Sequence, residues 1–332
     1  MEIIKVDEMG ISFDSRTKKK EKVKILQNIN LSIEEGEIVA LVGESGCGKT
    51  TLGKTIVGLY EPTEGAVCYQ GKDISRMNKK EYMDYRLGVQ MVHQDSFAAL
   101  NPNRTIFQSL SLPLLQHRLA ANKKEAEEIL TEYFTEVGLT PAEQFLYKYP
   151  HQLSGGQRQR ILLARALSVK PKVIVADEPV SMVDVSLRIA LIDLMTRMNQ
   201  KYKISFIYIT HDLATARYVA KNGRLAVMYL GKIVEMNNIR QAIDNPRHPY
   251  FKALIAAVPS HVGSGKSEMK DLPLRSLDMP SVNNPPSGCS FHTRCPYYQE
   301  KCEKESPKLR DFEGGKIACH YAEEINLRKK SN

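Results

Sequence analysis

The sequence has no long hydrophobic run. Its longest apolar stretches have the length of a strand, so no segment is expected to cross a bilayer. The first residues, Met1 to Lys5, lack the long apolar core of a signal peptide. We therefore expect a cytoplasmic protein whose membrane role, if it has one, comes through partner chains. The 332 residues are enough for one large domain with an appendage, or for two domains.

Clustered positive charge is also scarce. The net charge is +9, but the basic residues are scattered apart from Lys18, Lys19 and Lys20, which predict an exposed loop tip. A nucleic-acid surface is therefore not expected. Closely spaced cysteine pairs, which structural zinc sites usually use, are missing as well. Six cysteines in a cytoplasmic chain argue against disulfides and for free thiols or a metal site.

Residues 43–51 are the most informative stretch that is present. They match G-x-x-x-x-G-K-[ST], and they lie between the apolar run Ile38–Val42 and a helical pattern that continues to Leu59. Glycines let such a loop curl until its backbone N–H groups point at phosphate oxygens, and the helix start adds partial positive charge. The expected nucleotide-binding residues are Gly43, Glu44, Ser45, Gly46, Cys47, Gly48, Lys49, Thr50 and Thr51.

Two of these residues have specific expected roles, and a carboxylate pair completes the chemistry. Lys49 is expected to reach the β- and γ-phosphates, and the Thr50 hydroxyl is expected to bind Mg²⁺. Asp177 and Glu178 follow the buried-type strand 172–176. Asp177 fits the role of holding the Mg²⁺ shell, and Glu178 is placed to act as the general base toward water. Two solvated carboxylates at a strand end are the plain alternative.

Two further polar residues follow strand ends. Gln94 comes after a strand expected at 86–92, where it could contact the metal and orient a water molecule. His211 comes after a strand expected at 204–209, where it could hydrogen-bond the γ-phosphate. Each is a weak signal alone, because single residues of these types are more often structural.

A second glycine-rich helix start follows Leu153. Ser154 is placed as an N-cap, and Gly155, Gly156 and Gln157 leave backbone N–H groups free for phosphate. Two such sites in one chain suggest a nucleotide held between two copies or two related chains. An ordinary helix cap is the alternative.

The remaining pattern indicates an α/β protein with a helix-rich insertion at 97–150. A closing hairpin is expected with Gly231 at its turn. Strands are expected at 2–7, 25–33, 66–70, 86–92, 172–176, 204–209, 224–229 and 232–236.

Taken in order, the phosphate loop, Gln94, residues 153–157, the Asp177-Glu178 pair, Asp184 and His211 strongly resemble the ATP-binding cassette of ABC transporters. The resemblance covers about residues 1–240. It implies that Gln94 lies in the Q-loop and also contacts Mg²⁺, and that residues 154–157 contact ATP held by a partner cassette. It also implies that Asp184 belongs to the loop that joins the two sites. The catalytic residues that it implies are Lys49, Gln94, Glu178 and His211.

The same resemblance places Phe13 at the adenine-stacking position, although a core phenylalanine is an equal alternative from the residues alone.

The sequence departs mildly from the usual cassette motifs at two places. Cys47 stands where serine is usual, and residues 181–184 replace the commoner Ser-Ala-Leu-Asp. Neither change removes a catalytic group, so this half-site is expected to hydrolyse ATP.

The C-terminal part is similar to the oligopeptide/dipeptide/nickel importer branch, on residues 245–259 and 285–302. Thiolates gathered in a small domain can hold a [4Fe–4S] cluster or Zn²⁺. Because some members of the branch carry an iron–sulfur cluster, we expect a structural [4Fe–4S] cluster, with zinc or freely packing thiols as alternatives. The expected ligands are Cys289, Cys295, Cys302 and Cys319.

These observations predict an α/β fold, an ABC-type P-loop NTPase cassette over residues 1–240. It has a parallel-sheet core, an antiparallel β lobe and a helical subdomain at about 97–165, and a small cysteine-containing domain follows at 241–332. The implied function is an ATPase that uses ATP and Mg²⁺ to power uptake of oligopeptides or dipeptides at the cytoplasmic face of the membrane. The implied partners are a paralogous ATPase subunit, two transmembrane permeases and an extracytoplasmic substrate-binding protein.

Three other functions are alternatives. Nickel or oligosaccharides are alternative cargoes, because the cargo does not contact this chain. A soluble nucleic-acid ABC ATPase predicts a coiled-coil insertion or a duplicated cassette, and the sequence has neither. A nucleotide-binding regulatory subunit without turnover predicts the loss of Glu178 or His211, and both are present.

Overall fold

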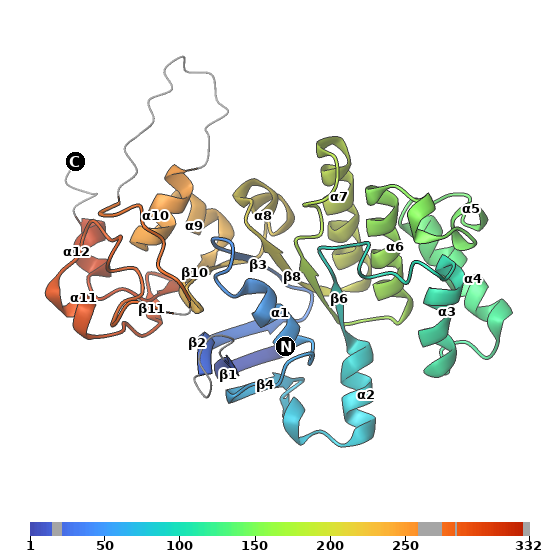
Figure 1. Cartoon of the computed structure of the whole chain (residues 1–332), viewed down its shortest axis with the longest axis horizontal. Coiled ribbons are helices and arrows are strands. Elements are labelled where there is room, and N and C mark those ends of the chain that lie inside the picture. Colours follow the sequence, from blue (N-terminus) through green and yellow to red (C-terminus); the bar gives the residue numbers. More distant parts are fainter. Residues whose placement is uncertain (15–21, 258–273, 283, 328–332) are drawn as a thin grey trace, which may run out of the picture.

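The computed structural model describes residues 1–14, 22–257, 274–282 and 284–327. The expected lysine loop at 18–20 and the end of the 245–259 segment lie outside these residues. The described residues form two sheets, a group of helices at one end of the molecule and a C-terminal region at the other (Figure 1). Within the described ranges, no helix is both long enough and apolar enough to span a bilayer.

The core sheet has eight strands in the order β11-β12-β10-β9-β3-β8-β7-β6. Its centre is parallel, since β3 pairs with β8 and β9, β8 with β7, and β7 with β6 in parallel register. Helices cover both faces, so β3, β7 and β8 are buried along their whole length. The central strands are β3 (Ile38–Val42), β6 (Val89–Val92), β7 (Val173–Asp177), β8 (Ser205–Thr210) and β9 (Arg224–Tyr229).

Two hydrophobic cores lie on opposite faces of this sheet. Val39 and Leu41 of β3 pack with helix α1 (Lys49–Ile56) and the antiparallel lobe. Ala40 and Val42 of the same strand pack with the other core, which includes helices α7 (Val185–Tyr202) and α8 (Leu213–Val219). This alternation is what a strand buried on both faces requires.

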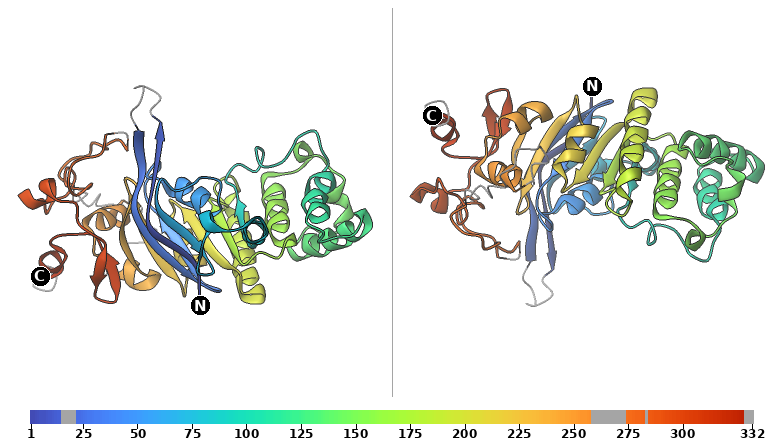
Figure 2. Two further views of the ribbon diagram at one scale, coloured as in Figure 1. Left: turned by 90° about the horizontal axis from the view of Figure 1, so that it is seen from below. Right: turned by 90° about the horizontal axis from the view of Figure 1, so that it is seen from above.

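The antiparallel lobe is a four-stranded sheet in the order β2-β1-β4-β5. Its strands β1 (Glu2–Asp14) and β2 (Lys22–Glu34) are longer than the sequence predicted, and β4 (Glu64–Tyr69) and β5 (Lys72–Asp73) complete it. Figure 2 shows this lobe (blue) lying across the core sheet, between the helical subdomain and the C-terminal region.

The strand expected at 86–92 is only partly present. Helix α2 (Lys79–Gly88) occupies residues 86–88, and β6 begins at Val89. A capping box of Asn78 and Glu81 starts the helix. The buried Tyr85 hydroxyl donates to the carbonyl of Ile56 at 2.6 Å, which ties the last turn of α2 to the core. This tertiary packing outweighs the strand-like pattern of the sequence.

The helical subdomain consists of α3 (Ile106–Gln116), α4 (Lys123–Glu136), α5 (Glu143–Leu146) and α6 (Gly155–Ser168), with a short 3-10 helix, η2 (Pro150–Gln152), before α6. A second 3-10 helix, η1 (Ile74–Arg76), precedes α2. Apolar residues of α3, α4 and α6 share the core that covers one face of the central sheet, so this subdomain is packed onto the cassette.

The C-terminal region continues the core sheet. Strand β10 (Lys232–Asn238) forms the expected hairpin with β9, and Gly231 at the turn has a positive φ of 77°. Strand β12 (Gly315–Ile317) pairs with β10 through Glu235 opposite Ile317, and β11 (Arg310–Phe312) pairs with β12. The helices of this region are α9 (Ile239–Asp244), α10 (Pro249–Ala256), α11 (Glu300–Lys304) and α12 (Ala322–Leu327).

Candidate nucleotide site

The phosphate loop connects β3 to α1, as the motif predicted. Gly43 and Gly48 have φ values of 156° and 105°, which favour glycine over other residues. A Cβ on Gly43 would lie 2.2 Å from the carbonyl oxygen of Met228, so the loop passes directly against the end of β9. The position therefore requires glycine for space as well as for backbone conformation.

Lys49 is curled back over the loop. Its side chain is buried, and Nζ donates to the carbonyl oxygens of Gly43 at 2.7 Å and Glu44 at 3.0 Å. The lysine also lines a cleft of about 390 Å³. The other lining residues are Ile25, Ser45, Gly46, Gly48, Thr50, Thr51, Gln94, Glu178 and His211. The geometry thus presents one cation and several loop N–H groups to a single cleft.

Asp177 lies at the end of β7 beside the start of α1. Its Oδ1 accepts a hydrogen bond from the Thr50 hydroxyl at 3.1 Å, and burial raises the pKa of its carboxyl. A hydroxyl and a carboxylate this close form the oxygen-only donor set that Mg²⁺ prefers. A carboxyl that burial penalises when charged also gains from a nearby cation. Both observations fit a magnesium ion held between Thr50 and Asp177.

Glu178 is the centre of a small cluster of polar groups. Its Oε2 accepts from Gln94 Nε2 at 2.9 Å, and its Oε1 lies 3.0 Å from His211 Nδ1. Its backbone has a positive φ of 43°, and its N–H donates to the carbonyl of Ile209 at 2.9 Å. Strained backbone of this kind is typical of functional positions.

The cluster forms because three neighbouring parallel strands end at the same edge. Gln94 follows β6, Glu178 follows β7 and His211 follows β8, and these strands are adjacent in the sheet. A general base is a proton acceptor that its neighbours hold in position. Here the neighbours contact both carboxylate oxygens of Glu178. The structure therefore brings the three residues together, and their catalytic roles stay predictions.

The residues at 154–157 do not line this cleft. They start α6, where Ser154 Oγ accepts from the N–H of Gln157 at 3.3 Å and the Gln157 side chain accepts from the N–H of Ser154 at 2.9 Å. A Cβ on Gly155 would lie 3.0 Å from the carbonyl of Met182. The helix start thus packs on the segment before α7, and its nucleotide contact stays a prediction.

Phe13 does not line the cleft either. It lies at the end of β1, is 39% exposed, and its ring packs edge-on against Tyr60 with centroids 5.2 Å apart. Ile25 occupies the cleft wall instead. The adenine-stacking role of Phe13 also stays a prediction.

Two residues of the C-terminal region contact the phosphate loop, and the sequence analysis missed both. The Tyr250 hydroxyl accepts the N–H of Glu44 at 2.9 Å, and Arg294 Nη1 lies 3.2 Å from both carboxylate oxygens of Glu44. These partners are 206 and 250 residues apart in the chain, and no local pattern of the sequence marks such contacts.

The iron–sulfur prediction is wrong. All four cysteines line one small apolar pocket, but among the described residues no group of His, Cys, Asp or Glu is arranged to hold a metal ion. The cysteines are free, and burial raises the pKa of Cys289 and raises those of Cys295 and Cys319 to about 12. The structure shows packed thiols at this place.

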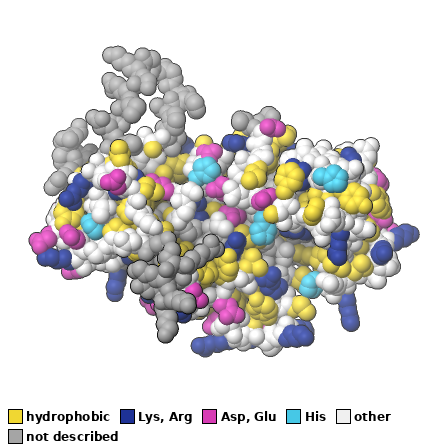
Figure 3. Space-filling model, viewed as in Figure 1, with side chains coloured by type: hydrophobic (Ala, Val, Ile, Leu, Met, Phe, Trp, Pro, Cys, Tyr) yellow, Lys and Arg dark blue, Asp and Glu magenta, His cyan; other side chains and the backbone are white. Residues whose placement is uncertain are grey.

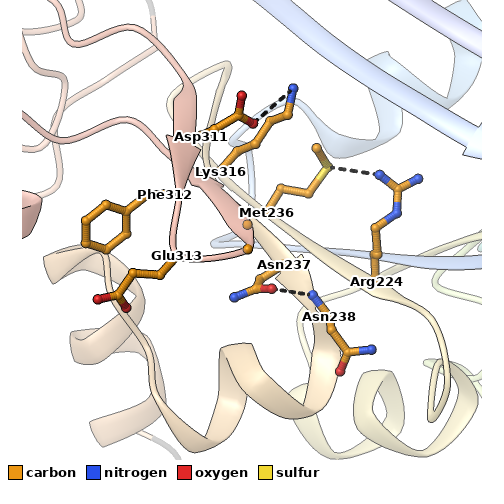
Figure 4. Close-up of a pocket in the computed structure, with 10 residues that line it drawn as sticks. Arg224, Met236, Asn237, Asn238, Asp311, Phe312, Glu313 and Lys316 are labelled. Atoms are coloured by element: carbon orange, nitrogen blue, oxygen red, sulfur yellow. Dashed lines mark hydrogen bonds and ion pairs between the residues drawn. The ribbon is translucent and has the colours of Figure 1, made fainter.

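A larger cavity of about 520 Å³ lies between β10 and the β11–β12 hairpin (Figure 4). Arg224 and Asn237, which line this cavity, form an ion pair and a hydrogen bond with other residues of the chain. Arg224 forms a two-pronged ion pair with Glu37 at 2.5 and 2.8 Å, and the Asn237 amide oxygen accepts the N–H of Asn238 at 2.8 Å. The phosphate loop does not line it, so the cleft at Lys49 remains the candidate site for a nucleotide.

Two family models match this chain, each over a different region. Residues 26–181 match the family model described as ABC transporter, and residues 234–302 match the model of the oligopeptide/dipeptide transporter C-terminal region. The chain is 40% identical over 300 residues to the oligopeptide transport ATP-binding protein AppF of Bacillus subtilis, which covers 90% of this chain and 89% of the relative. It is 39% identical to the di/tripeptide transport ATP-binding protein DppF of Pseudomonas aeruginosa, over 92% of both chains.

Solved structures give the same fold. A dimeric bacterial ABC transporter cassette, MJ0796, superposes with a TM-score of 0.64 at 30% identity and covers 72% of this chain and 99% of that one. A second structure of the same cassette, in a post-hydrolysis state with ADP and phosphate, has a TM-score of 0.64 at 29% identity. The predicted ABC-type cassette fold is therefore confirmed. The chain belongs to the ABC transporter family, in the oligopeptide/dipeptide branch of its ATP-binding proteins.

Proposed function

We propose that this chain is the ATP-hydrolysing subunit of a membrane importer that takes up oligopeptides or dipeptides. The observation that carries the proposal is the Gln94–Glu178–His211 cluster, which lines one cleft together with Lys49. Relatives named for peptide transport match nine-tenths of the chain, which supports the peptide cargo.

In the proposed mechanism, Lys49 and the N–H groups of the phosphate loop bind the β- and γ-phosphates of ATP. Glu178 accepts the proton of the attacking water, while Gln94 and His211 hold its two carboxylate oxygens and orient it. The His211 side chain is 63% exposed, so it is free to turn toward a γ-phosphate. A magnesium ion between Thr50 and Asp177 would neutralise phosphate charge.

We further propose that a second cassette completes the site. The Ser154–Gln157 segment starts a 14-residue helix yet lies outside its own chain's cleft, which supports a contact with nucleotide held by a partner. The solved relatives are described as dimeric. We expect the partner to be a paralogous ATPase chain, so that the importer carries two different cassettes.

The helical subdomain is the proposed contact with the permease subunits. It exposes large side chains, and Figure 3 shows hydrophobic groups on this part of the surface. They include Phe97, Leu112, Tyr147 and Tyr149, which are 57, 42, 54 and 39% exposed. Docking there would hold the chain at the cytoplasmic face of a membrane, beside two permeases fed by an external binding protein.

We also propose that the chain divides near residue 240 into a cassette and a C-terminal domain. The C-terminal family match begins at residue 234, which supports a boundary close to this position.

Peptide uptake tests the proposed function. Cells that lack this chain should fail to accumulate a radiolabelled tripeptide, and the wild-type chain should restore uptake. Glu178→Gln should bind ATP but restore no uptake, whereas Glu61→Gln, at an exposed position outside the helices and strands, should behave as wild type. Full uptake with Glu178→Gln would overturn the general-base assignment. Restored uptake of nickel or an oligosaccharide, without peptide uptake, would overturn the cargo.

A further inference from the structure

Glu44 of the phosphate loop is held on three sides. Its N–H donates to the Tyr250 hydroxyl at 2.9 Å, its carbonyl accepts from Lys49 at 3.0 Å, and its carboxylate pairs with Arg294 at 3.2 Å. Two of these three partners come from the C-terminal region. The first variable position of the phosphate loop is thus fixed by residues outside the cassette core.

Glu44 does not line the phosphate cleft. The cleft is lined by its neighbours from Ser45 onward, whereas Glu44 lines a second cleft of about 380 Å³ together with Tyr229 and residues 279–282. Its side chain therefore faces the C-terminal region, and the next residue, Ser45, lines both clefts. The Glu44 carboxylate thus belongs to the residue directly before the part of the loop that lines the phosphate cleft, where a highly charged triphosphate would bind.

Arg294 is buried where it meets this carboxylate. Its side chain is only 8% exposed, against 25% for Glu44. The guanidinium lies over the rings of Tyr229 and Phe291, 6.0 and 5.8 Å from their centroids. Removal of water from the pair strengthens the attraction between its charges and makes either charge costly without the other.

Tyr250 is equally enclosed. It is 1% exposed, and its ring centroid lies 4.5 Å from that of Tyr229 and 5.6 Å from that of Phe291. The same aromatic cluster therefore supports both groups that hold Glu44. A displacement of the C-terminal region would move the tyrosine hydroxyl and the guanidinium together.

We propose that Arg294 is a positioning residue for nucleotide binding, which it serves by neutralising and fixing Glu44, with Tyr250 holding the backbone of the same residue. This inference rests on the proposed function. Without the guanidinium, the Glu44 carboxylate repels the triphosphate and frees the loop to change shape. The C-terminal region thus sets the affinity of the cassette for ATP.

Calorimetric titration of the purified chain with MgATP tests the inference. Arg294→Gln is expected to raise the Kd about tenfold, because a partly desolvated carboxylate is left unpaired near the phosphates. Glu44→Gln should bind at least as tightly as wild type, since it removes the negative charge. The double variant should recover to within about twofold of wild type, a non-additivity that charge compensation requires.

Two further variants separate positioning from simple loss of structure. Arg294→Lys keeps the charge and should lose less affinity than Arg294→Gln. Arg275→Gln is the matched control, because Arg275 stacks on Tyr298 at 4.2 Å in the same region and is not a partner of Glu44. The loss in Arg294→Gln should also shrink in 1 M KCl, since salt screens the exposed part of the repulsion.

Four results would count against this inference. Wild-type affinity in Arg294→Gln would overturn it, and so would a double variant as weak as Arg294→Gln, since that indicates structural damage rather than uncompensated charge. If Arg294→Gln does not fold, lower affinity in Glu44→Gln than in Arg294→Lys would overturn it. A wild-type chain that binds no ATP would overturn the proposed function itself, and with it this inference.

Discussion

Glu235 is a buried carboxyl whose titration should be visible in the stability of the protein. It lies in β10, is 1% exposed, and accepts the N–H groups of Arg247, at 3.2 Å, and His248, at 2.7 Å. Burial raises its pKa from 4.5 to about 7, against the opposing effect of these hydrogen bonds. The folded protein therefore binds this proton more tightly than the unfolded chain does.

The sign of the effect follows from proton counting. Between about pH 4.5 and 7 the folded state holds more protons at Glu235 than the unfolded state, so the free energy of unfolding falls as the pH rises. Each pKa unit corresponds to about 1.4 kcal/mol, so the full shift amounts to on the order of 3 kcal/mol. The contribution of Glu235 to the free energy of unfolding is fully present below pH 4.5 and is lost as the pH rises through 7.

Glu235→Gln removes the titration and keeps an acceptor oxygen of similar shape. Urea unfolding followed by far-UV circular dichroism at pH 5 and pH 8 measures the effect. Between pH 5 and pH 8, the free energy of unfolding of the variant should rise by on the order of 3 kcal/mol relative to that of wild type. His248, whose pKa burial lowers to about 3, contributes equally to both proteins, and Glu61→Gln should follow wild type. Parallel pH profiles for wild type and Glu235→Gln would refute the reasoning.

Two further predictions concern the phosphate loop. Lys49→Ala removes the ammonium that bridges the loop carbonyls and lines the cleft, so ATP should no longer raise the melting temperature; an unchanged ATP-induced shift would contradict the assignment. Gly43→Ala places a Cβ 2.2 Å from the Met228 carbonyl oxygen. It should lower the free energy of unfolding by about 1–3 kcal/mol and should also weaken ATP binding. Gly46→Ala, which meets nothing within 4 Å, should cost less in the same melting and titration experiments, and equal losses would argue against steric contact as the cause.

The candidate site was largely predictable because its geometry follows from topology. Gln94, Glu178 and His211 follow successive strands of one parallel sheet, and parallel strands end at a common edge. The loop motif supplied Lys49 and Thr50 at the same edge. The loop motif, the strand ends and the resemblance to an ABC cassette pointed to these residues, and their roles toward the nucleotide stay predictions.

The errors arise where tertiary contacts decide the outcome. Residues 86–88 are helical because Tyr85 is anchored in the core. The four cysteines of the C-terminal region do line one pocket, but their spacing in the sequence does not show whether the fold arranges them to hold a metal, and among the described residues it does not. The contacts of Tyr250 and Arg294 with Glu44 depend on how the C-terminal region folds back, which no local pattern encodes.

The pairing of β12 with β10 has a consequence for the behaviour of the chain in solution. Strand β9 pairs with one side of β10, and the hairpin of β11 and β12 lies on its other side. A chain cut after β10 would leave a row of backbone donors and acceptors unpaired, which is a template for pairing with other molecules. The hairpin of β11 and β12 therefore also covers part of the β10 edge, which would otherwise be open to pairing with other molecules.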